Sequence, residues 1–176
     1  MNYEAPNTIM QAIQDRLGTL LTWDSSEPLF DHIGWYDRED AVAEALRQMI
    51  RQTTKRVCII RPSSTVYENR NDGNSVHSRR WLDLDLYVCD RVFASVGSSQ
   101  PAKFGGPGNE GALPMSEIVV NALAGDQLGN SLLMLPENGG FVEVQDAGKK
   151  VSSTRSCWLQ PFLVDAGETT FKRPLW

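Results

Sequence analysis

Residues 79–90, RRWLDLDLYVCD, alternate apolar and polar side chains more regularly than any other part of the chain. Leu82, Leu84, Leu86 and Val88 are separated by single residues that include two aspartates. Because successive side chains of a β-strand point to opposite faces of its sheet, this pattern predicts a strand with a leucine face in the core and a wetter aspartate face. The chain must therefore build a sheet that packs one face on a core.

Three other stretches have the helical period. Apolar residues recur every three or four positions in residues 8–21, 38–53 and 114–124, which predicts three amphipathic helices. Acidic residues at the start of the second stretch and basic residues at and beyond its end suit the helix dipole. Pro114 suits the first turn of the third helix and Gly125 its C-terminal cap.

Further strands are expected at 57–60, at 141–145 and within 149–165. Pro62 should stop the first of them, and Pro161 should place the last at an edge or a bulge. Turn signals at 72–73 and 146–148 join strands that are neighbours in sequence, which favours antiparallel pairing. The order of elements predicts an α+β fold, a small antiparallel sheet with helices packed on one face, in a single domain of residues 1–176.

Several segments show no period. We expect long loops at 69–78 and 94–113, an aromatic linker at 22–36 and a polar C-terminal tail at 166–176. Loops of this length are usually functional or disordered, and the 94–113 loop should be mobile in the isolated protein and ordered in an assembly. Surfaces of this kind suit contact with other subunits, and the expected contact residues are aromatic. They are Trp35, Phe104 and Trp176.

Composition narrows the class of protein. A net charge of −5 argues against sequence-independent nucleic-acid binding, which needs an excess of Lys and Arg. Cys58, Cys89 and Cys157 are widely spaced in apolar stretches, so we expect buried free thiols in a reducing compartment. The N-terminus does not have the pattern of a signal peptide, and no stretch reaches the ~18 apolar residues of a membrane span. We expect a soluble, cytoplasmically made protein.

The aspartate pair is the main candidate for chemistry. Asp83 and Asp85 share one face of the predicted strand and could bind Mg²⁺ as nuclease carboxylates do. Such a nuclease would also need an acidic residue, a spacer and a Lys on a following strand, and the nearest stretch, residues 143–145, has Gln in place of that Lys. A solvated strand face is the simpler explanation of the pair, because half-solvated antiparallel strands routinely alternate apolar with charged residues. His32 and His77 lie in polar stretches outside any metal motif. Because no reaction has a complete set of residues, we expect no enzyme activity, cofactor or metal.

The order of elements resembles that of tail terminator (tail completion) proteins of tailed bacteriophages, and most of all the Mu-like contractile-tail branch. The likeness covers most of the chain as an order of elements, apart from the second helix and the 94–113 loop. The segments that carry it are NTIMQAIQDRL, VCII, WLDLDLYV, MSEIVVNALAG, FVEVQ and CWLQPFLV.

This resemblance implies a virion protein of the tail or neck, made in the host cytoplasm. It implies a ring of identical subunits, a homo-hexamer, that caps the tail tube protein, ends tail polymerisation and meets the tail sheath protein and the head–tail connector. DNA would only pass through the lumen, which suits a negative charge, and no membrane is involved. Three alternatives stay open: a neck or stopper protein of the head–tail joint, a small host-encoded adaptor, and a Mg²⁺-dependent nuclease that uses Asp83 and Asp85.

Overall fold

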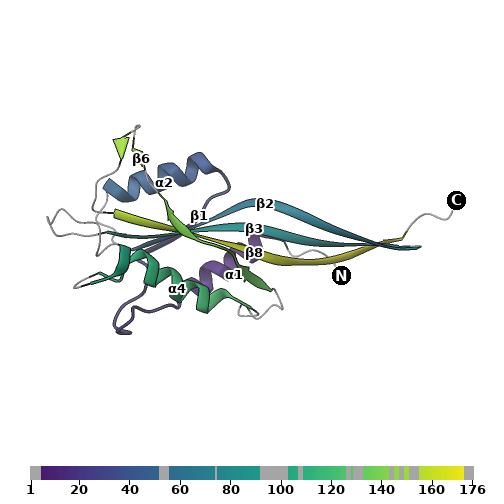
Figure 1. Cartoon of the computed structure of the whole chain (residues 1–176), viewed down its shortest axis with the longest axis horizontal. Coiled ribbons are helices and arrows are strands. Elements are labelled where there is room, and N and C mark those ends of the chain that lie inside the picture. Colours follow the sequence, from purple (N-terminus) through teal and green to yellow (C-terminus); the bar gives the residue numbers. More distant parts are fainter. Residues whose placement is uncertain are drawn as a thin grey trace.

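The strand predicted at 79–90 lies at the centre of a six-stranded sheet in the computed structural model of the protein (Figure 1). The structure describes residues 5–51, 56–73, 75–91, 103–106, 109–125, 128, 133–142, 145–146, 149–150 and 155–172. The main path of the sheet contains β1 (His32–Trp35), β2 (Val57–Asp72), β3 (Ser75–Arg91), β8 (Arg155–Lys172) and β4 (Met134–Pro136), in that order. A sixth strand, β5 (Gly140–Val142), also pairs with β8. β1 is parallel to β2, and the other pairs in this sheet are antiparallel.

The predicted α+β class is confirmed, and its three predicted helices are all present within a few residues of their expected bounds. They are α1 (Pro6–Gly18), α2 (Glu39–Arg51) and α4 (Ala112–Leu123). A two-stranded sheet, β6 (Gln145–Asp146) with β7 (Lys149–Lys150), forms where the turn at 146–148 was predicted. Among the described residues, no helix has the length and apolar character needed to cross a membrane.

The helices cover both faces of the sheet, which corrects the expected one-sided arrangement (Figure 1). α1 and α4 pack with the leucine face of β3, and α2 packs with Val57, Ile59 and Cys89 on the opposite face. The physical reason lies in β2, whose first four residues are all fully buried. A continuous apolar run of this kind needs cover on both sides of its sheet.

The predicted alternation in β3 is confirmed. The leucine set at 82, 84 and 86 and Val88 are buried in the core with α1 and α4, whereas Asp83, Asp85 and Tyr87 are only partly buried. Trp81 and Cys89, on the same face as the aspartates, are nevertheless buried. That face is therefore partly accessible to solvent along the middle of the strand and buried at Cys89, beneath α2.

Three strands continue past the helices as an arm, formed by β2, β3 and β8 (Figure 1). These strands have 16, 17 and 18 residues, and a strand of 16 residues spans about 50 Å. The arm replaces two expected features: residues 69–78 are not a loop but a tight hairpin around Gly73, and residues 166–172 are not a tail but the end of β8. Residues 173–176 lie outside the described part of the chain.

Both prolines sit where the sheet tolerates them. Pro62 does not stop β2, because β1 pairs only with residues 57–60 and a bulge follows between Pro62 and Ser64. Pro161 lies opposite Asp85 of β3. On its other side, β5 pairs with residues 157–159 and β4 with residues 162–164, so Pro161 falls between them. Its missing N–H therefore interrupts neither of these ladders.

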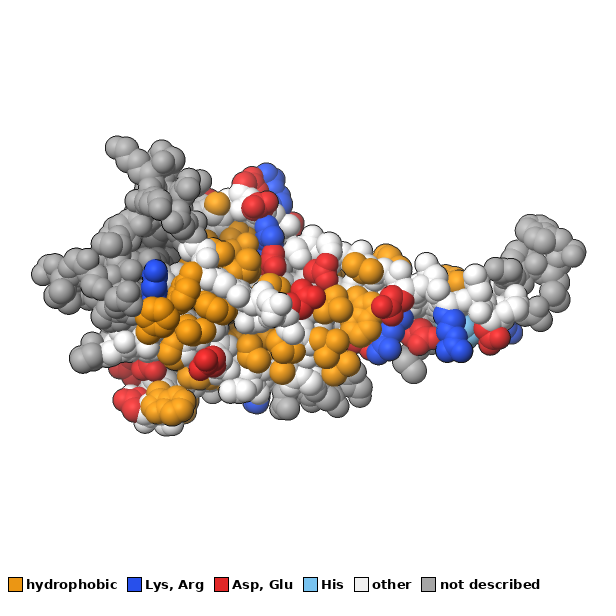
Figure 2. All heavy atoms as spheres, in the orientation of Figure 1, with side chains coloured by type: hydrophobic (Ala, Val, Ile, Leu, Met, Phe, Trp, Pro, Cys, Tyr) orange, Lys and Arg blue, Asp and Glu red, His pale blue; other side chains and the backbone are white. Residues whose placement is uncertain are grey.

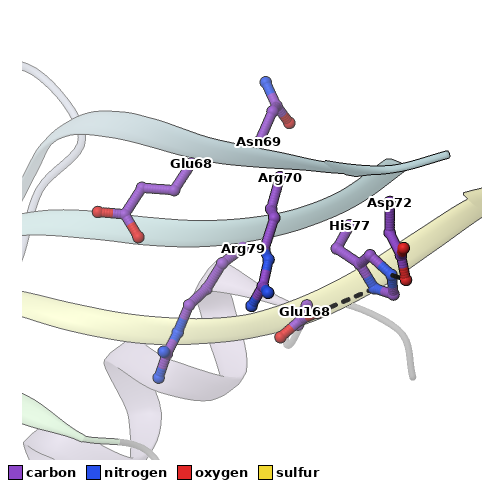
Figure 3. Close-up of a pocket in the computed structure, with 7 residues that line it drawn as sticks. All are labelled: Glu68, Asn69, Arg70, Asp72, His77, Arg79 and Glu168. Atoms are coloured by element: carbon purple, nitrogen blue, oxygen red, sulfur yellow. Dashed lines mark ion pairs between the residues drawn. The ribbon is translucent and has the colours of Figure 1, made fainter. Parts of the chain in front are cut away.

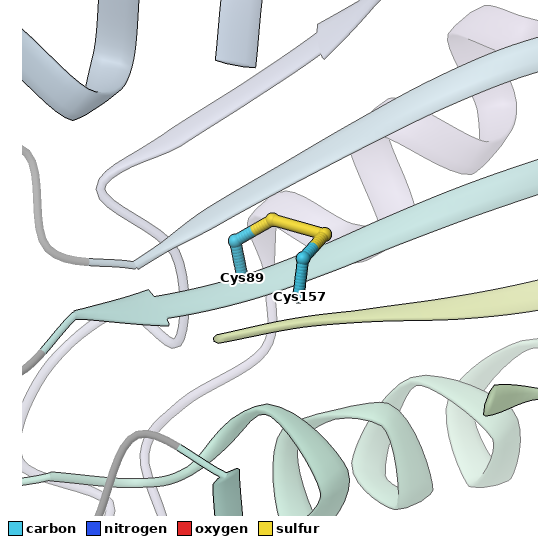
Figure 4. Close-up of a disulfide and its surroundings, with 2 residues drawn as sticks. All are labelled: Cys89 and Cys157. Atoms are coloured by element: carbon cyan, nitrogen blue, oxygen red, sulfur yellow. A yellow bond between two sulfur atoms is a disulfide. The ribbon is translucent and has the colours of Figure 1, made fainter. Parts of the chain in front are cut away.

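Cys89 and Cys157 lie directly opposite each other on β3 and β8 and form a disulfide bond (Figure 4). This corrects the prediction of three free thiols. The two cysteines are 68 residues apart in sequence, so no short spacing motif predicts that they pair. Cys58 on β2 is the free cysteine, and its complete burial raises the pKa of its thiol far above the usual range.

Candidate interaction site

One face of the arm is lined with charged side chains (Figure 3). Three rows cross its strands, and each row contains residues that are partners in the sheet register. They are Glu68–Arg79–Glu168, Arg70–His77–Thr170 and Asp72–Ser75–Lys172. His77 links the rows, with Nδ1 at 3.4 Å from Oε1 of Glu168 and 3.0 Å from Oγ1 of Thr170, and Nε2 at 3.8 Å from Oδ2 of Asp72. The face thus carries interleaved charges of both signs.

The opposite face of the arm is largely uncharged. Asn69 points away from the charged side chains in Figure 3, and alternation places Tyr67, Asn71 and Phe171 on the same side as Asn69. The side chains of Tyr67 and Phe171 are 52% and 55% exposed. An isolated domain gains little from aromatic side chains held on a two-sided solvent-exposed ribbon, so this face suits contact with another chain.

The hollow on the charged face does not resemble a small-molecule pocket. Its walls consist of charged and polar side chains, without an apolar floor. Small-molecule sites are usually concave, mostly apolar cavities with a few polar groups. The geometry therefore favours a macromolecular contact surface over a substrate site.

At the base of the arm, the two candidate metal ligands have partners of their own. Asp85 accepts hydrogen bonds from the guanidinium of Arg61, including Nε at 3.1 Å, and Asp83 accepts one from the Ser64 hydroxyl. Arg61 also lies 3.6 Å from Glu39 at the start of α2. Among the described residues, no cluster of three or more His, Cys, Asp or Glu is arranged to hold a metal ion. These contacts explain the aspartate pair as the joint between arm and body.

A second ion pair holds the other side of this joint. Arg79 donates to Oδ2 of Asp165, with Nε at 3.1 Å, and the N–H of Gly167 donates to Oδ1 at 3.0 Å. Arg79 also stacks over the ring of Trp81, 4.7 Å from its centroid. Burial alone would raise the pKa of Asp165, but these hydrogen bonds outweigh it and hold that pKa below its ordinary value.

The body carries an aromatic surface, defined here as Trp23, Phe104, Phe141 and Trp158. Phe141 lies between Phe104 and Trp158 in edge-to-face contacts, with ring centroids 5.7 Å and 4.9 Å apart. Phe104 and Trp23 line a common shallow hollow beside α4. Trp23 is 86% exposed and Phe104 52%. Figure 2 shows broad hydrophobic areas on the body, and exposed aromatics of this kind mark binding surfaces.

A buried aspartate organises the loop that carries Phe104. Asp90, at the end of β3, is fully buried and accepts hydrogen bonds from the N–H of Gly111 at 2.8 Å and from Nδ2 of Asn109 at 3.2 Å. Gly111 has a φ of 87°, and a Cβ there would lie 2.1 Å from the backbone nitrogen of Gly105. The described second half of the predicted 94–113 loop is therefore tied to the sheet, while residues 92–102 and 107–108 lie outside the described residues.

Trp23 is held by an ordered turn in the linker. Asp24 accepts hydrogen bonds from the side chains of Thr22 and Ser26, at 2.7 Å and 2.6 Å. The Ser26 and Thr22 hydroxyls lower the pKa of Asp24 to about 2. The N–H of Trp23 also donates to Oε2 of Glu110 at 3.3 Å, which attaches the linker to the loop in front of α4.

The three predicted contact residues do not form one site. Phe104 lies on the aromatic surface, next to β5. Trp35, 39% exposed, ends β1 at the opposite edge of the sheet, and Trp176 lies outside the described residues. Sequence reasoning missed Asp90 and the row formed by Phe141 and Trp158. The available signal was an aspartate at a strand end followed by a glycine-rich loop.

Comparison with known protein families finds no family model that matches the chain, and comparison with curated proteins finds no match.

Proposed function

We propose that this protein is a structural subunit of a phage tail, a tail terminator that assembles as a ring of six copies on the last ring of the tail tube. The observation that carries the proposal is the separation of two contact surfaces. The arm projects from one end of the molecule, whereas the aromatic surface belongs to the helix-covered body (Figures 1 and 2). A head-to-tail ring needs two such different surfaces on each subunit.

The remaining features agree with an assembly role. The residues beyond Ile60 in β2 and beyond Asp165 in β8 contribute few buried apolar side chains to the cores. A specific contact between subunits buries on the order of 1,200 Å² in total, and an arm of this length offers surface of that size. In this proposal the ring ends polymerisation of the tube and presents its other side to the sheath and the head–tail connector. DNA passes through a lumen that a chain of net charge −5 does not attract.

Electron microscopy of tails assembled with and without the protein tests this function. Without it, tubes should overgrow or fail to join heads, whereas tails of normal length and normal attachment would refute the proposal. The double variant Trp23→Ser/Phe104→Ser should reproduce the loss, because it removes two aromatic contacts from the surface and leaves the core intact. Arg38→Ala, in an exposed ion pair beside α2, is the control and should support normal tails.

A neck or stopper protein would also form a ring but would bind the portal side. Pull-down of purified tube protein and of purified portal protein separates the two functions. Binding to the portal alone would refute the terminator role and support the stopper.

A further inference from the structure

The arm has two uncovered edges. In the described residues, no strand pairs with the outer edge of β2 beyond Ile60, and none pairs with the outer edge of β8 beyond Val164. Within the described residues, these edges comprise residues 61–72 of β2 and 166–172 of β8, because the N–H of Asp165 still donates to the C=O of Leu133. Long uncovered edges attract other strands, and stable proteins normally shorten, distort or cover them. Here bulges distort only the start of each edge, at Pro62–Ser64 in β2 and between Asp165 and Glu168 in β8.

Hydrogen-bond alternation shows which backbone groups face outward. The hairpin closes at the pair Asp72–Ser75 with two residues between them, an arrangement in which the closing residues bond to each other. Pairs bonded to β3 then recur at every second residue of β2, so the backbone N–H and C=O groups of Tyr67, Asn69 and Asn71 point toward the outer edge of β2. The backbone N–H and C=O groups of residues 75, 77 and 79 of β3 form their hydrogen bonds with β2. Their partners on β8, residues 168, 170 and 172, therefore also face outward.

The two edges are compatible in direction. β2 and β8 are both antiparallel to β3, so they run the same way. A rotation about an axis along the arm keeps strand direction, and it brings the β8 edge of one copy against the β2 edge of the next as a parallel pair. β2 already accepts a parallel partner, because β1 pairs with it in this manner over residues 57–60.

Charged side chains at the edges are also complementary. The side chain of Arg70 makes no ion pair or hydrogen bond to the described residues, and neither does the side chain of Lys172. A register that places Asn69 opposite Thr169 of the neighbouring copy sets Asp72 beside Lys172. A shift of two residues sets Arg70 beside Glu168 instead. Both registers keep the charged and uncharged faces of the arm continuous from copy to copy.

We propose that the arm pairs edge to edge with a second copy of this chain, β2 to β8 in parallel, so that the arms form one continuous sheet around the ring. This inference rests on the proposed function for the closed ring, but the edge pairing is tested separately. About six backbone hydrogen bonds would form at each contact, because each strand directs the N–H and C=O groups of three residues outward. The occupant is a second copy rather than an unrelated strand, because each copy supplies both halves of the contact.

Disulfide trapping in the full-length chain tests the pairing. Within one subunit Asn69 and Thr169 lie two strands apart, both beside Ser78, at about 10 Å, which exceeds the reach of a disulfide. In Asn69→Cys/Thr169→Cys, oxidation should therefore link different copies and produce a ladder of covalent multimers. Asn71→Cys/Thr169→Cys tests the register shifted by two. Adding Thr170→Pro, which removes an outward N–H of β8, should abolish the ladder.

Two controls make each outcome decisive. Asn69→Cys/Ser78→Cys joins direct partners and should give only an internal crosslink, which reports a folded arm. Dimers that form equally with Asn69→Cys alone would show β2–β2 pairing and overturn the proposal. Absence of crosslinks from both double variants, at the highest concentration that stays in solution, would also overturn it. The length of tails assembled without the protein, measured by electron microscopy, is an independent readout. If these tails overgrow but the double variants give no crosslinks, only the edge pairing is refuted. If the double variants give crosslinks but these tails have normal length and attachment, only the terminator function is refuted.

Discussion

Replacing Leu84 by Ala should strongly destabilise the protein. Leu84 is fully buried on β3, between Pro62 of β2 and Phe162 of β8, and its side chain belongs to the core under α1 and α4. The substitution removes three carbon groups, worth about 0.8 kcal/mol each, or about 2.4 kcal/mol in transfer free energy. The cavity left behind increases the loss in unfolding free energy to about 3–5 kcal/mol.

Urea unfolding followed by circular dichroism measures this loss. With a denaturant slope of about 2 kcal/mol/M, the midpoint should fall by about 2 M while the slope stays unchanged. Asp83→Ala is the matched control, since it changes the neighbouring residue on the other face and removes only the hydrogen bond from Ser64. Its cost should stay within about 1 kcal/mol. Equal losses for the two variants would refute the assignment of faces in β3.

Three further outcomes follow from the site. Asp85→Ala should lower the unfolding free energy by about 1.5–3 kcal/mol, because it leaves the partly buried guanidinium of Arg61 without its main partner. A loss below about 0.5 kcal/mol, the usual range for surface substitutions, would contradict the role of Asp85 in the joint. Gly111→Ala should lower the unfolding free energy by about 1–3 kcal/mol and displace the loop that carries Phe104, because a Cβ would collide with the backbone of Gly105. An unchanged melting temperature would refute this prediction. The pKa of Asp165 is lowered in the folded protein, so its carboxylate contributes stability that is present above the ordinary Asp pKa and is lost as pH falls through the lowered one. Denaturation midpoints measured from pH 7 down to pH 2 should therefore fall less steeply in Asp165→Asn than in the native chain, and parallel curves would contradict the assignment.

Local sequence determined the elements of this protein. The period of two in residues 79–90 and the helical period in three stretches reflect side-chain directions along one chain segment, and α1, α2, α4 and β3 appear where these periods lie. The hairpin turn at Asp72-Gly73 is likewise local, because Gly73 takes a positive φ of 48° without steric penalty. The pairing of neighbouring strands, and so the α+β class, followed from these signals.

Tertiary structure decided how the elements are combined. The sequence predicts a loop and a tail where the arm lies, because the strands of the arm are polar on both faces. Without a buried face they lack the apolar–polar alternation that marks a strand in sequence. The disulfide joins Cys89 to Cys157 and the hydrogen bonds of Asp90 reach residues 109–111, so both depend on strand register and loop path rather than on local pattern. The sequence does not predict β1, because four residues at a sheet edge are too few to show a period. The face of the sheet on which α2 packs depends on which face α1 and α4 leave uncovered.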